Sequence, residues 1–368
     1  MAKALERAGK MALARFISLF LSKRRMTAQE LGRLEVSRLL IIRQHHQMGD
    51  MLLAVPAFRG LRARFGNARI TLLATPVNAA VMQRNPYVDE VLVLPRKRGL
   101  RGPYDLVRFI VDLRRRHFDA AIVLNTVSFS VSSMLLAVAS GARMRIGSTS
   151  EPFGHDLTSR FYHLELPLPP REELAAMHES AHNLYPLSAI GVRVTDLTSR
   201  FAPPEEDERE CERFIAASFG PGGRFIVVHP GAGKPPNVWP GGKYAEAVRI
   251  LGKAFRSGVV ATGGPADAVT LAAFLEACVD RPFVLPCPSV GFLGALMKRS
   301  VLTLCNDTGI LHIAGAVGAR CVAVFGPTDP ARWKPVNETV VALRGKDGSV
   351  DSVSVDEVVA AARALLGA

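Results

Sequence analysis

The sequence predicts an α/β protein made of two doubly wound, Rossmann-like domains that face a central cleft. Short apolar runs rich in β-branched residues alternate with helical patterns along most of the chain, which is typical of βαβ units and parallel sheets. The length of 368 residues exceeds the size of one domain, about 150 residues. Charge also divides the chain, because residues 1–200 carry 29 basic and 16 acidic side chains, whereas residues 201–368 carry 17 of each.

Residues 1–36 are expected to form a basic amphipathic N-terminal extension. One apolar stripe recurs at helical spacing, and basic side chains fall on another face of the same helix. Two explanations stay open, because such a helix either packs its stripe on the domain or lies at a membrane surface. The stripe comprises Leu5, Ala8, Ala12, Phe16 and Leu19, and the basic side chains are Lys3, Arg7 and Lys10.

Residues 37–203 are predicted to form the first Rossmann-like domain. Each expected strand is a short apolar run, and each expected helix between strands has apolar residues at a period near 3.6. The expected strands are 37–43, 69–75, 90–94, 120–125 and 143–147, and the expected helices are 51–65, 105–117 and 129–140.

Residues 204–354 are predicted to form the second domain, followed by a C-terminal helix over 355–368. Pro204 precedes an acidic run that suits the first turn of a helix, so we place the domain boundary there. The expected strands are 224–230, 258–264, 301–306 and 320–326, and the expected helices are 242–255, 267–279 and 308–317.

Cysteine usage and hydropathy exclude several protein classes. The five cysteines are dispersed without CxxC spacing, which argues against a disulfide framework and a zinc site and favours a reducing cytosol. No uncharged stretch is apolar enough to resemble a membrane-spanning helix of about 20 residues. The calculated pI near 10.0 is compatible with nucleic-acid binding, but no recognition module is evident, so we expect no nucleic-acid partner.

The first polar cluster lies at the end of the first expected strand, in RQHHQMGDMLLAVPAF (43–58). Loops at the carboxyl ends of parallel strands are where doubly wound folds bind ligands. Gly49 allows a sharp turn, and Asp50 is either a helix N-cap or a general base aimed into the cleft. His45 and His46 are rivals for the second role.

The second cluster, HPGAGKPPNVWPGGKYAEA (229–247), again has a strand, a Gly-rich loop and a helix. Such a loop can expose backbone N–H groups to a phosphate, and Lys234 and Lys243 can add positive charge. A purely structural turn is the alternative. Farther along, Asp267 follows the second strand of this domain, where an acid either accepts hydrogen bonds from a ribose or caps a helix.

The third cluster, CNDTGILHIAGAVGARCVAVFGPTDP (305–330), carries the strongest signal. Asp307 and Thr308 can cap the helix that begins near Gly309, whose exposed N–H groups and positive dipole end suit a diphosphate. His312 lies in the first helical turn and can point toward the same anion. A second Gly/Thr/Asp loop, FGPTDP, follows the next strand.

In this order, the motifs GD…P, HPGA…WP, GGP.D, NDTG..H and FGPTDP resemble those of glycosyltransferase family 9, the ADP-heptose:lipopolysaccharide heptosyltransferases. The resemblance extends from about Ser37 to Pro335. It implies a GT-B fold with the acceptor on the N-terminal domain and the nucleotide-sugar donor, expected to be ADP-heptose, on the C-terminal one. It also implies inverting transfer without a metal or other cofactor, and the sequence has no DXD triplet.

The family's site residues are carried over by motif. Asp50 matches the proposed acceptor base. Thr308, Gly309 and His312 match the diphosphate cradle, while Asp307 and Asp267 match a donor-contacting and a ribose-binding acid. One departure is clear, because Asn237 stands where the family usually has a lysine near the donor phosphates, and Lys234 or Lys243 would have to substitute.

The resemblance further implies an acidic glycolipid acceptor of the lipopolysaccharide-core type. Basic residues of the first half suit such an acceptor, and we assign Arg43, Arg96 and Arg98 to it. We therefore expect a cytoplasmic enzyme that transiently contacts the inner face of the bacterial inner membrane. Two alternative functions on the same fold are a nucleotide-sugar epimerase and a non-catalytic nucleotide-sugar-binding protein.

Overall fold

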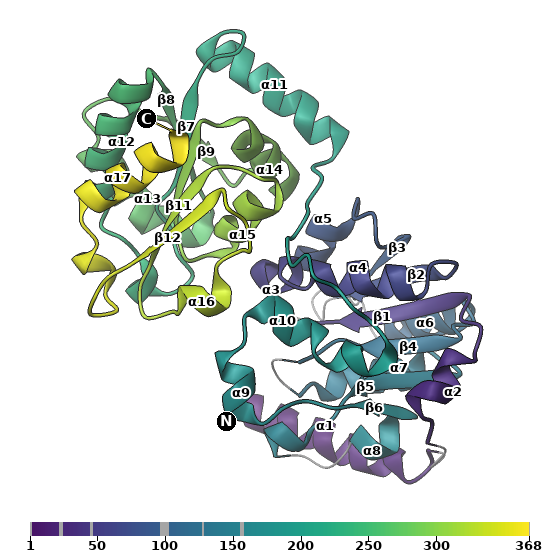
Figure 1. Cartoon of the computed structure of the whole chain (residues 1–368). Helices are drawn as coiled ribbons and strands as arrows, with labels where there is room; N and C mark the ends of the chain where they lie inside the picture. The colour runs from purple at the N-terminus through teal and green to yellow at the C-terminus, as the bar shows by residue number, and fades with distance from the viewer. Residues whose placement is uncertain are drawn as a thin grey trace. The chain divides into compact units, whose positions relative to one another are not determined.

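The N-terminal unit is built on a six-stranded parallel sheet with the strand order β3-β2-β1-β4-β5-β6 (Figure 1). The order reverses between β1 and β4, as it does in doubly wound folds. All but the first residue of β1 are buried, so this strand occupies the centre of the sheet. The strands are β1 Arg38–Arg43, β2 Arg69–Ala74, β3 Glu90–Val93, β4 Ala120–Val123, β5 Met144–Ser148 and β6 Leu164–Leu166.

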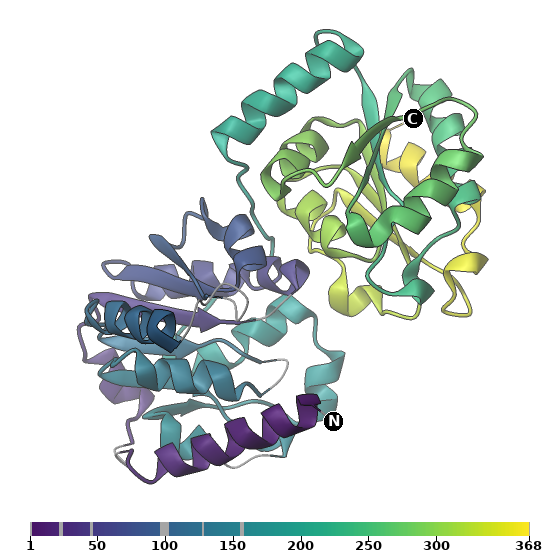
Figure 2. The same ribbon diagram turned by 180° about the vertical axis from the view of Figure 1, so that it is seen from behind.

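Helices cover both faces of this sheet, and α1, α6 and α7 lie on the same face (Figure 2). Right-handed crossovers place α6 and α7 on one face, because the connections from β3 to β4 and from β4 to β5 run in the direction opposite to those that precede them. The helices of this unit are α1 Ala2–Ser18, α2 Ala28–Gly32, α4 Val55–Arg64, α5 Pro76–Met82, α6 Pro103–Arg114, α7 Val131–Ala139, α8 Thr158–Phe161, α9 Arg171–Ala176 and α10 Glu179–Leu184, with 3₁₀ turns at Glu151–Phe153 and Pro186–Ile190.

The C-terminal unit repeats the same topology, with the strand order β12-β11-β10-β7-β8-β9 and all pairs parallel. Its order reverses between β7 and β10. The strands are β7 Phe225–His229, β8 Gly258–Gly263, β9 Phe283–Pro286, β10 Leu302–Asn306, β11 Cys321–Phe325 and β12 Val340–Arg344.

The helices of the C-terminal unit include the one that the acidic run predicted, α11 Glu205–Phe219. The terminal helix α17 packs through Val358 and Ala362 into the same core as Trp239, so it is part of this unit. The other helices are α3 Met48–Leu52, α12 Gly241–Phe255, α13 Ala268–Ala277, α14 Val290–Arg299, α15 Gly309–Ala316, α16 Pro330–Trp333 and α17 Val355–Leu366, with 3₁₀ turns at Pro235–Asn237, Pro265–Asp267 and Val350–Ser352.

This architecture comes from a computed structural model that describes residues 2–21, 25–44, 47–95, 103–126, 129–154 and 158–367, without the side chains of 2–8, 10 and 103. One compact unit comprises Met1–His46 and Ala54–Leu197, and the other comprises Gln47–Leu53 and Thr198–Ala368. The short helix α3 therefore groups with the C-terminal unit, although it follows β1 in the chain. The donor and acceptor roles given to the two domains stay predictions.

The single helix predicted over 51–65 is wrong, because two helices, α3 and α4, occupy this stretch. Pro56 lies in the first turn of α4, where its missing N–H is tolerated. In the interior of a continuous helix the same proline would remove a hydrogen bond and clash with the preceding turn. Three edge strands, β6, β9 and β12, were not predicted at all.

No helix in the part of the chain described here has both the length and the apolar character needed to cross a membrane.

Candidate functional site

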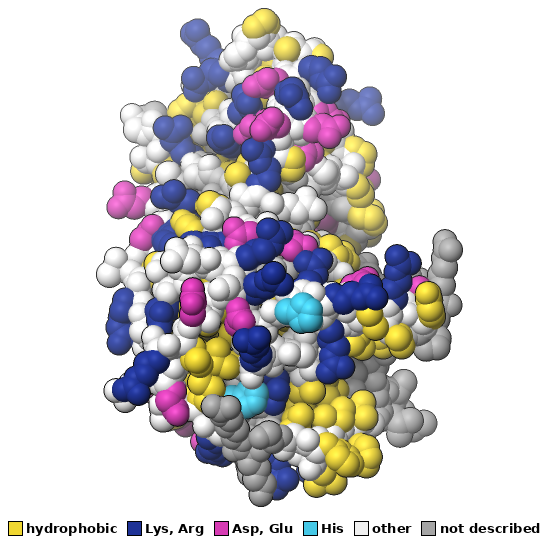
Figure 3. Space-filling model, turned by 90° about the vertical axis from the view of Figure 1, so that its right-hand side faces the viewer, with side chains coloured by type: hydrophobic (Ala, Val, Ile, Leu, Met, Phe, Trp, Pro, Cys, Tyr) yellow, Lys and Arg dark blue, Asp and Glu magenta, His cyan; other side chains and the backbone are white. Residues whose placement is uncertain are grey.

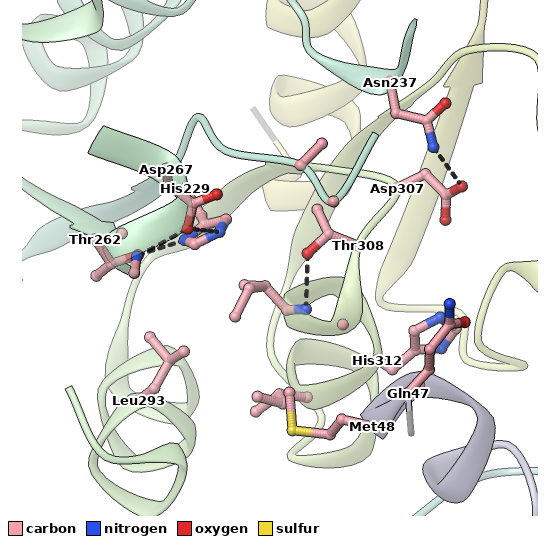
Figure 4. Close-up of a pocket in the computed structure, with 18 of the residues that line it drawn as sticks. Gln47, Met48, His229, Asn237, Thr262, Asp267, Leu293, Asp307, Thr308 and His312 are labelled. Carbon is pink, nitrogen blue, oxygen red and sulfur yellow. Dashed lines mark hydrogen bonds and ion pairs between the residues drawn. The ribbon is translucent and has the colours of Figure 1, made fainter. Parts of the chain in front are cut away.

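A cavity of about 580 Å³ opens at the carboxyl edge of the second sheet (Figure 4). It lies entirely within the C-terminal unit, next to the reversal between β7 and β10, where doubly wound folds bind ligands. Its polar lining comes from the N-terminal end of α3, from the ends of β7 and β8 and the loops after them, from α15, and from the loops after β10 and β11. The polar or charged residues among those that line it are Gln47, Asp50, His229, Lys234, Asn237, Thr262, Asp267, Asp307, Thr308, His312 and Thr328.

The buried Asn306 side chain holds the wall of this cavity together. Its Nδ2 donates to the carbonyls of Pro230 and Gly231 at 2.9 and 3.0 Å, which ties the end of β10 to the loop after β7. Its Oδ1 accepts from the Trp239 backbone N–H at 3.0 Å and from the Tyr244 hydroxyl at 2.9 Å. All of its hydrogen-bonding capacity is thus spent on structure, which makes the loop a rigid support.

The N-terminus of α15 points its first turn toward the cavity. Thr308 is the N-cap, and its hydroxyl accepts from the Ile310 N–H at 3.2 Å. Gly309 leaves the first helical position without a side chain, and His312 follows within the same turn. The first turn of a helix carries unsatisfied N–H groups and the positive end of the dipole, so this geometry suits an anion.

The short helix α3 brings Asp50 to the same cavity. Asp50 is only 8% exposed, and it lies inside the first turn, whereas Gln47 is the N-cap, so the N-cap explanation for Asp50 is wrong. Gly49 packs directly on the His312 ring, since a Cβ there would lie 2.4 Å from its Cδ2. Gly309 and Met48 make a second close contact between α3 and α15.

Asp307 lies between an amide and a lysine. Asn237 Nδ2 donates to Asp307 Oδ2 at 3.2 Å, and this amide occupies the position where a lysine was expected from the family pattern (Figure 4). Burial raises the pKa of Asp307, while the Thr328 hydroxyl and the positive charge of Lys234 act in the opposite direction. Lys234 is exposed and lines the cavity, and its substitution for the expected lysine stays a prediction.

Asp267 forms a second acidic position, on the opposite side of the cavity from Asp307 in Figure 4. Its Oδ2 accepts from the Gly264 N–H at 2.8 Å and lies 3.7 Å from His229 Nε2. The other ring nitrogen of His229 lies 3.1 Å from the Thr262 hydroxyl. Burial lowers the pKa of His229, although Asp267 raises it, and the ring has little exposed surface.

Several predicted site residues are not brought to this cavity. Lys243 donates instead to the carbonyls of Asp351 and Val353, at 2.6 and 3.1 Å. Arg43 belongs to the N-terminal unit and is completely buried, with its guanidinium donating to Leu124 O and Asn183 Oδ1. The other predicted residues, Arg96 and Arg98, lie outside the described residues, as do the rival histidines His45 and His46.

Sequence reasoning missed His229, Gln47 and Cys287, which also line the cavity. His229 had a usable signal, because a histidine that ends a buried central strand must lie at the ligand-binding edge of the sheet. Gln47 and Cys287 had none, since their places depend on how α3 and the loop after β9 pack. Across the described stretches, no cluster of three or more His, Cys, Asp or Glu side chains is arranged to hold a metal ion.

Comparison with known proteins gives consistent matches. A family model described as glycosyltransferase family 9 (heptosyltransferase) matches residues 106–358. The chain is 26% identical over 304 residues to lipopolysaccharide heptosyltransferase 3 of Escherichia coli strain K12, covering 80% of this chain and 84% of that protein.

Solved structures of two glycosyltransferases are similar to the chain. A glycosyl transferase family 9 protein of Veillonella parvula matches with a TM-score of 0.78 and 22% identity, over 91% of this chain and 99% of that one. The E. coli heptosyltransferase WaaC, solved with ADP, matches with a TM-score of 0.69 and 18% identity, over 87% and 97%. These similarities show the fold, so the predicted GT-B class is confirmed.

Proposed function

Since the chain belongs to glycosyltransferase family 9, it is a glycosyltransferase, and we propose that it moves a heptose-type sugar from a nucleoside-diphosphate donor to an acidic glycolipid. ADP-heptose is the expected donor, and the core of lipopolysaccharide or a related glycolipid is the expected acceptor. The names of the similar proteins support both choices, because one is a lipopolysaccharide heptosyltransferase and another was solved with ADP.

One observation carries the proposal: a buried carboxylate and the N-terminus of a helix line the same cavity. Asp50 comes from α3, whereas Thr308 caps α15 and His312 lies in it, and the two helices pack against each other inside one unit. Group transfer from a diphosphate needs a base for the attacking hydroxyl and stabilisation for the departing anion. The cavity offers both kinds of group.

The proposed mechanism is an inverting displacement. Asp50 removes the proton of an acceptor hydroxyl while that oxygen attacks the anomeric carbon from the face opposite the diphosphate. The bond between the anomeric carbon and the diphosphate oxygen breaks, and the negative charge passes to the leaving nucleoside diphosphate. The N–H groups of the first turn of α15, together with His312 and Lys234, stabilise that charge.

We propose that this stabilisation requires no divalent ion. Asp267 would accept from the ribose hydroxyls of the donor, and Asp307 would contact the donor beside the diphosphate. Stabilisation of the leaving diphosphate then depends on fixed helix dipoles and side chains, which need no reorganisation during the reaction. Transfer should therefore continue in the presence of a chelator, and added magnesium should not increase its rate.

The acceptor contacts stay predictions for Arg96 and Arg98, whereas Arg43 is completely buried and offers no surface to an acceptor. An acidic lipid acceptor would be attracted by the basic excess of residues 1–200, and it would be met at the inner face of the inner membrane.

The Asp50→Asn variant tests the proposed base. Replacing the carboxylate by an isosteric amide should lower the transfer rate by about 10²–10⁴-fold, the usual contribution of general base catalysis. Donor binding, measured by the thermal shift that the donor produces, should be unchanged because Asp50 acts on the acceptor. A variant with full transfer activity would exclude Asp50 as the base.

A thermal-shift panel of ADP-, UDP- and GDP-sugars tests the donor. A ligand present at ~100 times its Kd stabilises the folded state by about 2.7 kcal/mol, so the preferred nucleotide should stand out. Asp267→Ala should reduce that shift. If donors bind but no acceptor preparation is glycosylated, a non-catalytic binding protein is favoured. If the donor sugar is altered without any acceptor, an epimerase is favoured.

A further inference from the structure

Residues 11–21, which comprise the second half of α1 and the turn that follows it, have two apolar faces, and among these residues only one face packs on the core. Ala14 is completely buried, and Met11, Ile17 and Leu21 pack with it on the core of the N-terminal unit. Of the stripe that the sequence suggested, the described side chains of Ala12, Phe16 and Leu19 are exposed on the other side. This outer face consists of Leu13, Phe16, Leu19 and Phe20, which are 50%, 60%, 69% and 74% exposed.

The outer face of α1 is a continuous hydrophobic surface. Residues 13, 16 and 20 recur at helical spacing, and the Phe16 and Phe20 rings pack edge to face with centroids 5.2 Å apart. Single exposed apolar side chains are common, but soluble proteins rarely expose several large ones together without a partner. The geometry therefore indicates a docking surface.

A second exposed apolar stripe lies on α6, on the same face of the sheet (Figure 2). Tyr104, Val107 and Val111 are 74%, 57% and 40% exposed, and both α1 and α6 contact α7. Figure 3 shows hydrophobic side chains gathered among arginines and lysines on the N-terminal unit. In that view the N-terminal unit combines apolar and basic side chains.

The positive charge around the outer face of α1 favours an anionic bilayer over a second copy of the chain as the partner. Exposed Arg15 flanks the outer face. Exposed Arg25 and Arg160 lie beyond the C-terminal end of α1. They belong to two segments that are held together there, because the Met26 N–H donates to His163 O next to α8. A second copy would bring two strongly basic N-terminal units together, since residues 1–200 hold the entire excess of +13. Aromatic and basic side chains on one amphipathic helix suit the interface of an anionic bilayer.

We propose that the outer face of α1 docks the protein on an anionic lipid bilayer. Phe16 and Phe20 insert at the boundary of headgroups and acyl chains, and the flanking arginines pair with anionic headgroups. Docking would hold the enzyme at the surface that presents its glycolipid acceptor. The benefit of docking therefore rests on the proposed function, whereas bilayer binding itself does not.

Vesicle flotation without donor or acceptor tests this inference. The full chain is mixed with vesicles of phosphatidylcholine plus phosphatidylglycerol, or of phosphatidylcholine alone. It should bind the anionic vesicles, and high salt should weaken the binding. The variant Phe16→Ser/Phe20→Ser should bind at least about tenfold more weakly, because it loses the burial of two aromatic side chains.

Val269→Ser/Val279→Ser is the matched control, because it removes two apolar side chains that are 82% and 85% exposed on the C-terminal unit. It should bind vesicles like the unmodified chain. Circular dichroism and the thermal midpoint should show that both variants are folded; if the phenylalanine variant is not, the milder Phe20→Ser is compared instead.

Three results would overturn the inference. The first is no binding to anionic vesicles, and the second is equal binding of the phenylalanine variant and the control. The third is a chain that does not bind vesicles but forms a dimer in light scattering, which the phenylalanine variant abolishes. The last result would assign the face to a second copy. Failure of the proposed function can be distinguished from failure of the docking inference. In that case the chain transfers no sugar to detergent-solubilised acceptor but still binds vesicles.

Discussion

Gly49 shows how one absent side chain sets the geometry of the cavity. The His312 ring lies where a Cβ at position 49 would be, so the backbone of α3 can approach α15 closely only with glycine there. The proposed base, Asp50, is the next residue. A small shift of α3 would therefore move the carboxylate relative to the proposed diphosphate site.

Gly49→Ala should lower the transfer rate by about 10²-fold, since a displacement near 1 Å costs that much when it misaligns reacting groups. Alanine favours helices, so the loss would come from the clash with His312 and not from helix propensity. The measurement is kcat with saturating donor. Gly233 also lines the cavity, but a Cβ there meets no other atom within 4 Å, so Gly233→Ala should retain activity. Equal effects of the two substitutions would contradict this prediction.

Asp307 makes a pH-dependent contribution to stability. Burial raises the pKa of its carboxyl in the folded state, so folding favours the neutral form. The favourable contribution is fully present below the ordinary pKa of an aspartate and is lost as the pH rises through the raised value. Asp307→Asn should therefore raise the thermal midpoint at neutral pH, with a gain that shrinks toward acid pH, while it weakens donor binding.

Asp347→Asn is a control of opposite sign. The Ser352 hydroxyl and the Ser349 N–H hold the pKa of Asp347 below its usual range, so its contribution is present above that range and is lost as the pH falls. This variant should be less stable than the unmodified chain at neutral pH and should become equal to it in acid. Parallel pH profiles for the two variants would count against the assignment for Asp307.

At the scale of elements, the N-terminus of α15 has both a structural and a proposed functional role. Thr308 caps α15, and Ser354 caps α17 in the same manner, each accepting from a helix N–H at 3.2 Å. Thr308 lines the cavity, whereas Ser354 is in the capping box of the terminal helix. The two caps therefore allow the structural role to be separated from donor binding.

Thr308→Ala and Ser354→Ala should each cost about 1 kcal/mol of stability, the usual value of an N-cap. Only Thr308→Ala should also weaken ADP binding, several-fold, because the first turn of α15 would lose its fixed geometry next to the diphosphate. Chemical denaturation gives the first quantity and calorimetric titration with ADP the second. Unchanged ADP affinity in Thr308→Ala would separate α15 from the donor.

At the scale of the whole molecule, the units do not follow the order of the chain. Residues 47–53 leave the N-terminal unit, and the chain returns to it at Ala54. The proposed base and the proposed diphosphate cradle are therefore parts of one compact unit. The N-terminal unit, which is the proposed acceptor domain, need not supply the proposed base, even though Asp50 follows its first strand in sequence.

Hydrogen exchange with and without ADP tests this grouping. ADP should slow amide exchange in α15 and also in α3, because the two helices pack together beside the proposed diphosphate site. The neighbouring helix α4, which follows α3 in sequence but belongs to the other unit, is the internal control and should be unaffected. Protection of α4 without protection of α3 would be contrary to the assigned grouping.

The sequence alone determined the two parallel sheets, their central strands and the loops that carry the polar clusters. Continuous apolar runs such as β1 and β7 are buried on both faces, so their pattern is unambiguous. The edge strands β6, β9 and β12 escaped prediction because they are short or partly exposed, and such strands lack a buried apolar run.

Tertiary packing alone decided which polar residues meet. Gly-rich loops and single carboxylates look alike in sequence whether they bind a ligand or end a helix, since both uses need the same side chains. The contact of Gly49 with His312, the turning away of Lys243 and the burial of Arg43 each depend on residues distant in the chain. Local patterns contain no information about such contacts, so only the folded chain could reveal them.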